Sequence, residues 1–178
     1  MLIVGAAMLL IGAGKRLEEP PLRGFAKPDV QPVKVELISE HASLQPGGMT
    51  HLGVHFELES GWHIYAQDPG DAGLPTTVAW SAPAEVSIGP LRWPPAQEFL
   101  DPGDIHTFGF SGMLVLTSPV TVAAHAAHGS TILIQADVSW MACKELCIPD
   151  NTRLELSLPV LEQPPALSTH AEFFDQVH

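Results

Sequence analysis

The residues best suited to chemistry are Cys143 and Cys147, the only cysteines in the chain of 178 residues. In an extended strand, residues four apart would have Cα atoms about 13 Å from one another. A disulfide needs Cα atoms about 4.4–6.8 Å apart, so the segment has to turn. The intervening Lys144, Glu145 and Leu146 are compatible with one helical turn, in which residues four apart are neighbours. Two thiols so placed can form a disulfide, bind a soft metal or simply pack.

A disulfide between these cysteines would close a very short loop. In the loop-closure model such a bond restricts the unfolded chain little, which makes it a poor structural staple. Strained or exposed disulfides tend instead to be the labile ones that take part in exchange. The spacing therefore favours a redox pair, while a metal-binding pair and a structural clip or unpaired thiols stay open as alternatives.

Runs with a period of two residues predict the elements that position the cysteines. Leu52, Val54, Phe56 and Leu58 alternate with mostly polar residues, and the segment 131–140 alternates in the same way directly before the cysteine motif. Further strands are expected near 33–38, 78–80, 86–88, 113–123 and 154–158, and a short helix at 171–177. Seven or eight short strands without a long helix predict an all-β fold, an immunoglobulin-like antiparallel β-sandwich.

Two stretches between these strands are rich in aromatic residues, histidine and glycine. The first covers residues 61–76 and contains His63 and Tyr65, the only tyrosine; the second covers residues 104–112 and contains Phe108. Their glycine and proline residues predict loops at both places. The rings would either pack over a reactive site or plug the ends of the sandwich.

Composition and charge indicate how the chain is organised. Residues 1–14 are uncharged and mostly apolar; a helix of this length spans about 21 Å, short of the hydrocarbon core of about 30 Å. They resemble the apolar part of an export signal and would act as a signal or as a tether. Residues 15–32 predict a proline-rich linker, 33–162 the folded domain, and 163–178 a C-terminal tail. We therefore expect an exported domain in a compartment where a disulfide persists.

The charge also bears on the class of partner. The formal net charge is −12, and no cluster of basic residues is present in the sequence. Proteins that bind nucleic acids neutralise phosphates with lysine and arginine, so nucleic acid is not an expected partner.

Several motifs, taken in order, resemble one family. They are Gly61-Trp62-His63-x-Tyr65, Asp68-Pro69-Gly70-Asp71-x-Gly73-Leu74-Pro75, Trp80, Trp93-Pro94, Phe108-Gly109-Phe110-x-Gly112 and Cys143-Lys144-x-x-Cys147-x-Pro149. Over residues 33–160 the chain resembles the N-terminal periplasmic domain of DsbD-type thiol:disulfide interchange proteins. The branch of the suppressor-of-copper-sensitivity protein B is the most similar. The order of the motifs makes the resemblance specific.

The resemblance implies a periplasmic, immunoglobulin-like domain whose cysteine pair passes electrons. In the family a membrane-embedded thiol reductase reduces the pair, which then reduces thioredoxin-like periplasmic proteins. Cys143 and Cys147 match the redox pair, and Cys147 matches the cysteine that bonds the partner. The chain would then be a component of a protein-disulfide reductase. The family's membrane and thioredoxin domains have no counterpart in these 178 residues, so we expect either a fragment or a domain served by a separate membrane protein.

The resemblance also implies a cap over the cysteine pair. Thr107, Phe108 and Gly109 fall where the family has a cap that shields the cysteines. His63 and Tyr65 fall where it places aromatic residues, and histidine departs from that pattern. The disulfide itself would be the redox centre, and no other cofactor is expected.

A copper-binding or copper-tolerance module is the alternative function. Thiolates with a nearby thioether suit Cu(I), and Met141 flanks Cys143 and Cys147. The same cysteine spacing occurs in Sco-type copper chaperones, where proline directly follows the second cysteine. In this chain Ile148 intervenes, and no thioredoxin-like βαβ pattern surrounds the motif.

Overall fold

The computed structural model describes residues 31–101 and 103–175. The signal-like segment 1–14 and nearly all of the predicted linker 15–32 lie outside the described residues, so the expectations for them stay predictions. Among the described residues, no helix has the length and apolar character needed to cross a membrane.

Ten strands and one turn of 3₁₀-helix make up the regular structure of the described residues. They are β1 (Val33–Ser39), β2 (Met49–Leu58), β3 (His63–Gly70), β4 (Thr77–Ser81), β5 (Val86–Ile88), β6 (Gln97–Asp101), β7 (Ile105–Ser111), β8 (Met113–Val122), β9 (Thr131–Cys143), β10 (Cys147–Pro159) and η1 (Ala171–Phe174). In the described part of the predicted C-terminal helix, up to residue 175, the structure has a single 3₁₀ turn.

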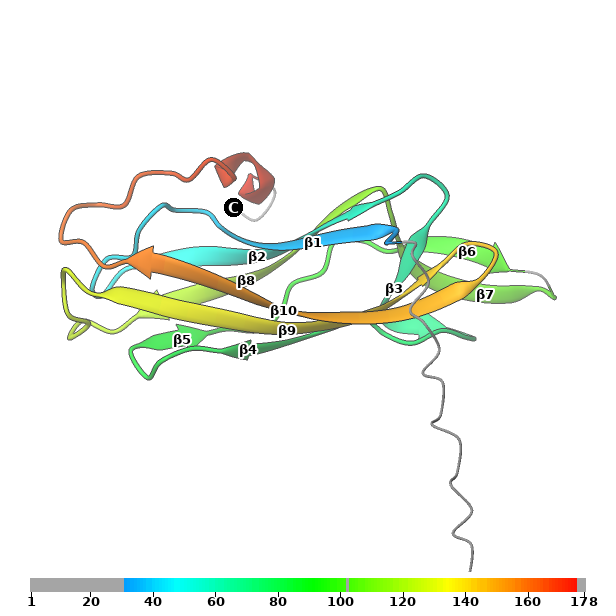
Figure 1. Ribbon diagram of the computed structural model, residues 1–178, viewed down its shortest axis with the longest axis horizontal. Helices are drawn as coiled ribbons and strands as arrows, with labels where there is room; N and C mark the ends of the chain where they lie inside the picture. Colours follow the sequence, from blue (N-terminus) through cyan, green and yellow to red (C-terminus); the bar gives the residue numbers. More distant parts are fainter. Residues whose placement is uncertain (1–30, 102, 176–178) are drawn as a thin grey trace, which may run out of the picture. The chain divides into compact units, whose positions relative to one another are not determined.

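The strands form two antiparallel sheets that pack face to face (Figure 1). The first sheet has the order β1-β2-β8-β5, and the second has the order β10-β9-β3-β7-β6, with β4 beside β9. This arrangement confirms the predicted all-β, immunoglobulin-like antiparallel β-sandwich. Both sheets expose one face and bury the other, as the alternating sequence runs require.

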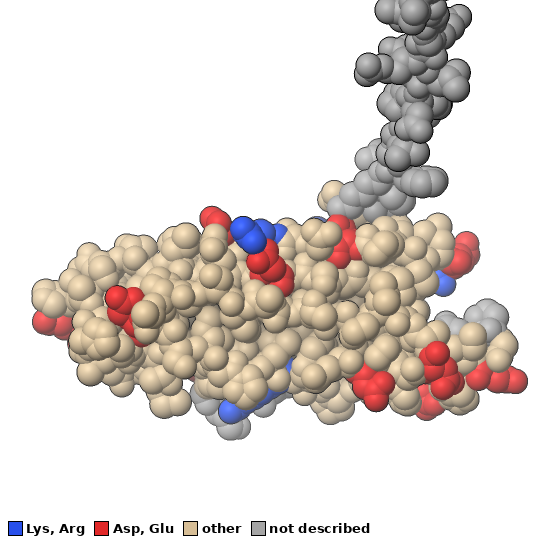
Figure 2. Space-filling model, turned by 90° about the horizontal axis from the view of Figure 1, so that it is seen from below, with Lys and Arg blue, Asp and Glu red and all other residues tan. Residues whose placement is uncertain are grey.

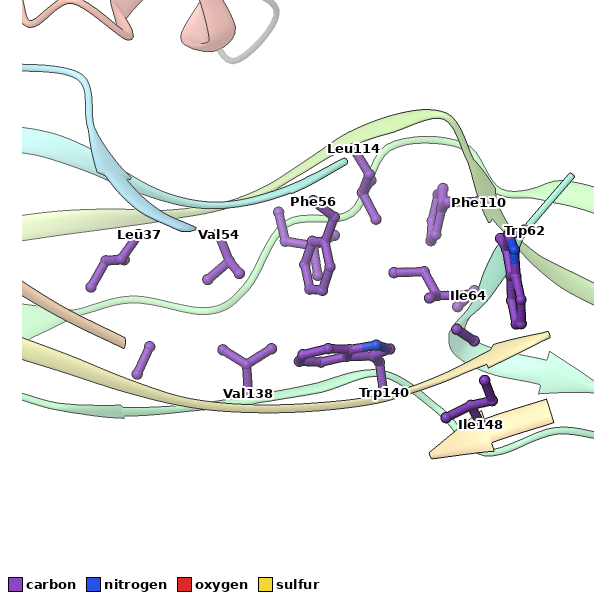
Figure 3. Close-up of a cluster of buried hydrophobic side chains, with 14 residues drawn as sticks. Leu37, Val54, Phe56, Trp62, Ile64, Phe110, Leu114, Val138, Trp140 and Ile148 are labelled. Atoms are coloured by element: carbon purple, nitrogen blue, oxygen red, sulfur yellow. The ribbon is translucent and has the colours of Figure 1, made fainter. Parts of the chain in front are cut away.

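The core fills the space between the two inward faces (Figure 3). Val54 and Phe56 of β2 face Val138 and Trp140 of β9, and the rings of Phe56 and Trp140 meet edge to face with centroids 6.0 Å apart. Because inward residues of β9 occupy even positions, the odd positions, among them Cys143, point to the outward face of the second sheet.

Each of the two stretches predicted as loops contains a strand. Residues 63–70 form β3, and residues 105–111 form β7, which pairs with β3 through Tyr65 and Gly109. A Cβ atom at Gly109 would collide with the carbonyl oxygen of Ile64. This glycine therefore permits two strands to approach each other, whereas the sequence had suggested a turn.

The outward face of β2 is also more buried than its alternation predicted. The rings of His55 and Phe173 stack with centroids 4.7 Å apart, and a Cβ atom at Gly53 would lie 3.1 Å from the Phe174 ring. The C-terminal turn η1 therefore covers part of the first sheet, as Figure 1 shows.

Candidate functional site

Cys143 and Cys147 are joined by a disulfide at one end of the sandwich. Cys143 ends β9, Cys147 begins β10, and the two residues are partners in the strand register with Cα atoms 4.1 Å apart. The segment turns, as the cysteine spacing requires, and residues 144–146 form the turn of a β-hairpin and not the helical turn with which they are also compatible. Opposed residues of an antiparallel pair already lie about 4.5–5.5 Å apart, so the hairpin brings the thiols together by itself.

The two sulfur-bearing residues have unequal surroundings. Cys143 is 3% exposed, whereas Cys147 is exposed to solvent. The hydroxyl group of Tyr65 donates a hydrogen bond to Sγ of Cys143 over 3.2 Å. The exposure of the two residues therefore favours attack from solvent at Cys147 over attack at Cys143.

Tyr65 is fixed in place by the segment that follows β3. The Thr76 hydroxyl donates to the Tyr65 carbonyl oxygen over 2.7 Å. Gly73, at φ 104°, lies directly on the Tyr65 ring, where a Cβ atom would come within 2.6 Å of ring carbons. Only glycine fits this position, and its close approach keeps the Tyr65 hydroxyl directed at Cys143.

His63 lies next to the disulfide on β3, where it is the register partner of Cys143. Its side chain is buried, and its ring meets Tyr65 edge to face with centroids 5.3 Å apart. On its other side the imidazole stacks on Phe99 of β6, with centroids 4.4 Å apart. His63 thus connects the cysteine pair to the β6–β7 hairpin.

The predicted cap residues lie on both faces of that hairpin. Thr107 is fully buried opposite Phe99, and Gly109 lies opposite Tyr65. Phe108 alternates with them and therefore points to the other face. There it lines a pocket of about 300 Å³ together with Trp93 and Phe110, among other residues.

The structure therefore does not place Phe108 beside the cysteines, and its shielding role stays a prediction. The ring on the cysteine side of the hairpin is Phe99, which the sequence did not single out. Its short strand lies between Pro95 and Pro102, and one aromatic residue between prolines was the only signal.

The side chain of Lys144, in the turn between the cysteines, extends to Ser60 and Gly61 in the turn between β2 and β3. Its ammonium group donates to the carbonyl oxygen of Ser60 over 3.2 Å, and its side chain covers Gly61. This contact ties the turn between the cysteines to the turn between β2 and β3. Glu145 and Leu146 are exposed in the same turn.

Met141, the further ligand of the copper hypothesis, is the partner of Pro149, one row from the cysteines on the same outward face. Within residues 31–101 and 103–175, no group of three or more histidine, cysteine, aspartate and glutamate side chains is arranged to hold a metal ion. Copper binding by the reduced pair stays a prediction that a titration has to test.

Comparison with solved structures finds a similar fold. The N-terminal periplasmic domain of ScsB from Proteus mirabilis aligns with a TM-score of 0.55 and 19% identity, covering 84% of this chain and 54% of that one. This chain thus spans about half the length of that domain. The reduced DsbD N-terminal domain of Neisseria meningitidis aligns with a TM-score of 0.38 and 12% identity, over 70% of this chain and 83% of that one.

Comparison of sequences gives the family. No curated protein matches the chain. The family model described as thiol:disulfide interchange protein DsbD, N-terminal, matches residues 29–159, which include both cysteines. The predicted resemblance is therefore confirmed: the chain belongs to the family of DsbD N-terminal domains.

Proposed function

We propose that this protein is a periplasmic thiol:disulfide interchange domain that carries electrons on Cys143 and Cys147. The donor is a membrane-embedded thiol reductase, and the acceptors are thioredoxin-like proteins. The observation that carries the proposal is the asymmetry of the pair, with Cys147 exposed and Cys143 buried beneath the Tyr65 hydroxyl. A staple would not need one sulfur at the surface and a hydrogen-bond donor on the other.

The exchange proceeds in two displacements. In the reduced domain the Cys147 thiolate attacks one sulfur of the acceptor disulfide, and the acceptor's other sulfur leaves as a thiolate and takes up a proton. The Cys143 thiolate then attacks Sγ of Cys147, the acceptor's bonded sulfur leaves as a thiolate, and the Cys143–Cys147 disulfide forms. Two electrons have passed to the acceptor, and the reductase restores the dithiol by the reverse steps.

Tyr65 assists at the buried sulfur. Whenever an incoming thiolate attacks Cys147, the sulfur of Cys143 leaves and carries the developing negative charge. Hydrogen bonds to charged groups are stronger than those to neutral groups, so the Tyr65 hydroxyl stabilises that charge more than it stabilises the disulfide. Cys143 thus becomes a better leaving group without being exposed to water.

The test compares the two single cysteine variants. In Cys143→Ala, the exposed Cys147 has no resolving partner, so it should accumulate a mixed disulfide with an oxidised thioredoxin-like protein, visible on a non-reducing gel. In Cys147→Ala, the remaining thiol is buried and should trap far less. Equal trapping by both variants would contradict the proposed order of attack.

A redox titration separates interchange from copper binding. The wild-type disulfide should equilibrate reversibly with glutathione or dithiothreitol buffers, and its midpoint should be the same with and without Cu(I). A wild-type pair that resists every thiol buffer would contradict interchange. A midpoint that moves strongly with Cu(I) would favour the copper module, because metal binding withdraws the reduced thiolates from the equilibrium.

A further inference from the structure

The outward face of the second sheet continues from the disulfide as regular rows of side chains. The strand register places Pro149 beside Met141, and then Asn151 beside Ser139 and Thr77. The next row holds Arg153, Asp137 and Ala79. Since alternate residues share a face, all these side chains point the same way as Cys147.

Apart from Lys144 and Glu145 in the turn itself, the two rows next to the cysteines carry no ionised side chain on this face. Pro149, Asn151, Ser139 and Thr77 are exposed and uncharged, although the chain has a formal net charge of −12. Figure 2 looks from below onto the side on which β4 and β9 lie in Figure 1, and much of it carries neither acidic nor basic groups. Depletion of charge is a property of the centres of protein interfaces.

A groove of about 500 Å³ lies on this face, lined by Thr77, Ser139 and Asn151 among other residues. The hydroxyl groups of Thr77 and Ser139 are 2.7 Å apart and hydrogen-bond to each other. Arg153 donates two hydrogen bonds to the Asp137 carboxylate, over 2.7 and 2.8 Å, on the side away from the disulfide. The groove thus presents neutral hydrogen-bonding groups on the side toward the disulfide, and the Asp137–Arg153 ion pair lines its other side.

The backbone of β10 next to Cys147 offers few free N–H groups with which another strand could pair. Pro149 has no N–H group, and the N–H group of Asn151 donates to the carboxylate of Asp150 over 2.8 Å. Proline and local charge protect strand edges against pairing with another strand. A partner at this site therefore has to contact the side chains of the face, since the backbone edge offers it few donors.

The size of a redox interface indicates how far a partner bound at Cys147 extends over this face. An interface at the upper limit for weak redox encounters buries about 1,200 Å² in total, so about 600 Å² on each partner, a disc about 14 Å in radius. Asn151 lies four residues from Cys147, or about 14 Å along the strand. A folded partner whose cysteine reaches Cys147 therefore extends to the row of Asn151, Ser139 and Thr77.

We infer that the outward face of β4, β9 and β10 is the docking surface for the thioredoxin-like protein that exchanges with Cys147. The partner's own cysteine lies on an uncharged surface with hydrogen-bonding groups that fit the groove. This inference rests on the proposed function and adds to it the surface and the chemistry of the partner.

The test introduces charge into the groove. Asn151→Glu and Asn151→Lys should each lower the second-order rate constant for reduction by reduced thioredoxin about tenfold, since an unpaired charge would be buried in the interface. Reduction by dithiothreitol should not change, because at 0.15 M salt the Debye length is about 8 Å and the new charge is farther away. Ser139→Glu repeats the test on β9 if a variant at 151 folds poorly.

Ser157→Glu is the matched control, on the same strand and the same exposed face. It lies ten residues from Cys147, about 34 Å along the strand, outside the footprint of the partner. This variant should react like the wild type with both thiols. The inference is overturned if the groove variants match the wild type with thioredoxin, or if either sign of charge accelerates the reaction. A wild-type disulfide that neither thiol reduces would overturn the proposed function instead.

Discussion

The two ends of the β9–β10 hairpin are held together in different ways. At the far end, Leu158 and Val160 are buried in an apolar cluster with Leu44, whose N–H group donates to the Pro159 carbonyl oxygen over 2.8 Å. At the other end a disulfide joins the strands beside the exposed Leu146. Packing alone holds the far end, whereas at the other end a covalent bond that a thiol can reach adds to the packing of Ala142 and Ile148. The proposed exchange requires such a difference, with the bond that reacts at the cysteine end.

The most decisive way to break this comparison is to remove both sulfurs. In Cys143→Ala/Cys147→Ala, thiol exchange should be lost entirely, while the free energy of unfolding should fall by at most about 2 kcal/mol, because the closed loop is short. Thiol labelling and chemical denaturation measure the two quantities. A double variant that unfolds where the wild type is stable would make the disulfide a structural staple after all.

The next largest effect is expected when leucine is replaced by alanine at each end of the β9–β10 hairpin in turn. Leu44→Ala deletes a side chain that is 1% exposed, so the free energy of unfolding should fall by about 2–5 kcal/mol. Leu146→Ala makes the same change at a residue that is 57% exposed and should cost less than about 0.5 kcal/mol. Reactivity of the folded disulfide should not change in Leu44→Ala. Similar costs at the two positions would show that the cysteine end is packed as tightly as the far end.

A third change tests the hydrogen bond at the buried sulfur. Tyr65→Phe keeps the ring beneath Gly73 and removes only the donor to Cys143. A hydrogen bond to a charged group is worth about 1.5–3 kcal/mol, and the leaving sulfur carries part of that charge, so reduction by dithiothreitol should slow about tenfold. An unchanged rate, with an unchanged unfolding temperature, would exclude a role for the hydroxyl in exchange.

A smaller effect is expected from removing one aromatic ring from either face of the β6–β7 hairpin. Phe99→Ala removes the ring stacked on His63 and should raise the rate of reaction with small thiols several-fold, since the cysteine side opens. Phe108→Ala is the control, because that ring lines the pocket with Trp93 on the other face. A larger increase in Phe108→Ala than in Phe99→Ala would support the predicted shielding role of Phe108.

These elements also show what the sequence could predict. The sandwich could be predicted from alternation, and the cysteine pair could be singled out because these cysteines are unique; both signals are local. The segments 61–76 and 104–112 were predicted as loops because glycine and proline usually mark turns. Their strands depend on pairing between Tyr65 and Gly109, residues far apart in the chain. For the same reason the contact of Phe99 with His63 could not be predicted from sequence.

The turn between the cysteines illustrates the same limit on a smaller scale. Residues 144–146 suit a helical turn by local propensity, yet the register of β9 and β10 makes them a hairpin turn. Tertiary pairing overrides a weak local preference of three residues. The asymmetry of Cys143 and Cys147 follows from this hairpin and from its neighbours on β3, so it too needed the structure.

The smallest predicted effect lies between the two ends, at the ion pair of Asp137 and Arg153. The hydrogen bonds from Arg153 hold the pKa of the Asp137 carboxyl below its ordinary value. A carboxyl with a lowered folded-state pKa contributes stability above its unfolded pKa, and this contribution is lost as the pH falls through the folded pKa. Asp137→Asn should therefore unfold at a slightly lower temperature than the wild type at pH 7, and the two should converge in acid, below about pH 4. Because both side chains are largely exposed, the difference should be small and should shrink further in 1 M salt, where the Debye length is about 3 Å. Thermal unfolding followed from pH 7 to pH 2.5 measures it, and a difference that widens on acidification would show that this ion pair does not stabilise the middle of the hairpin.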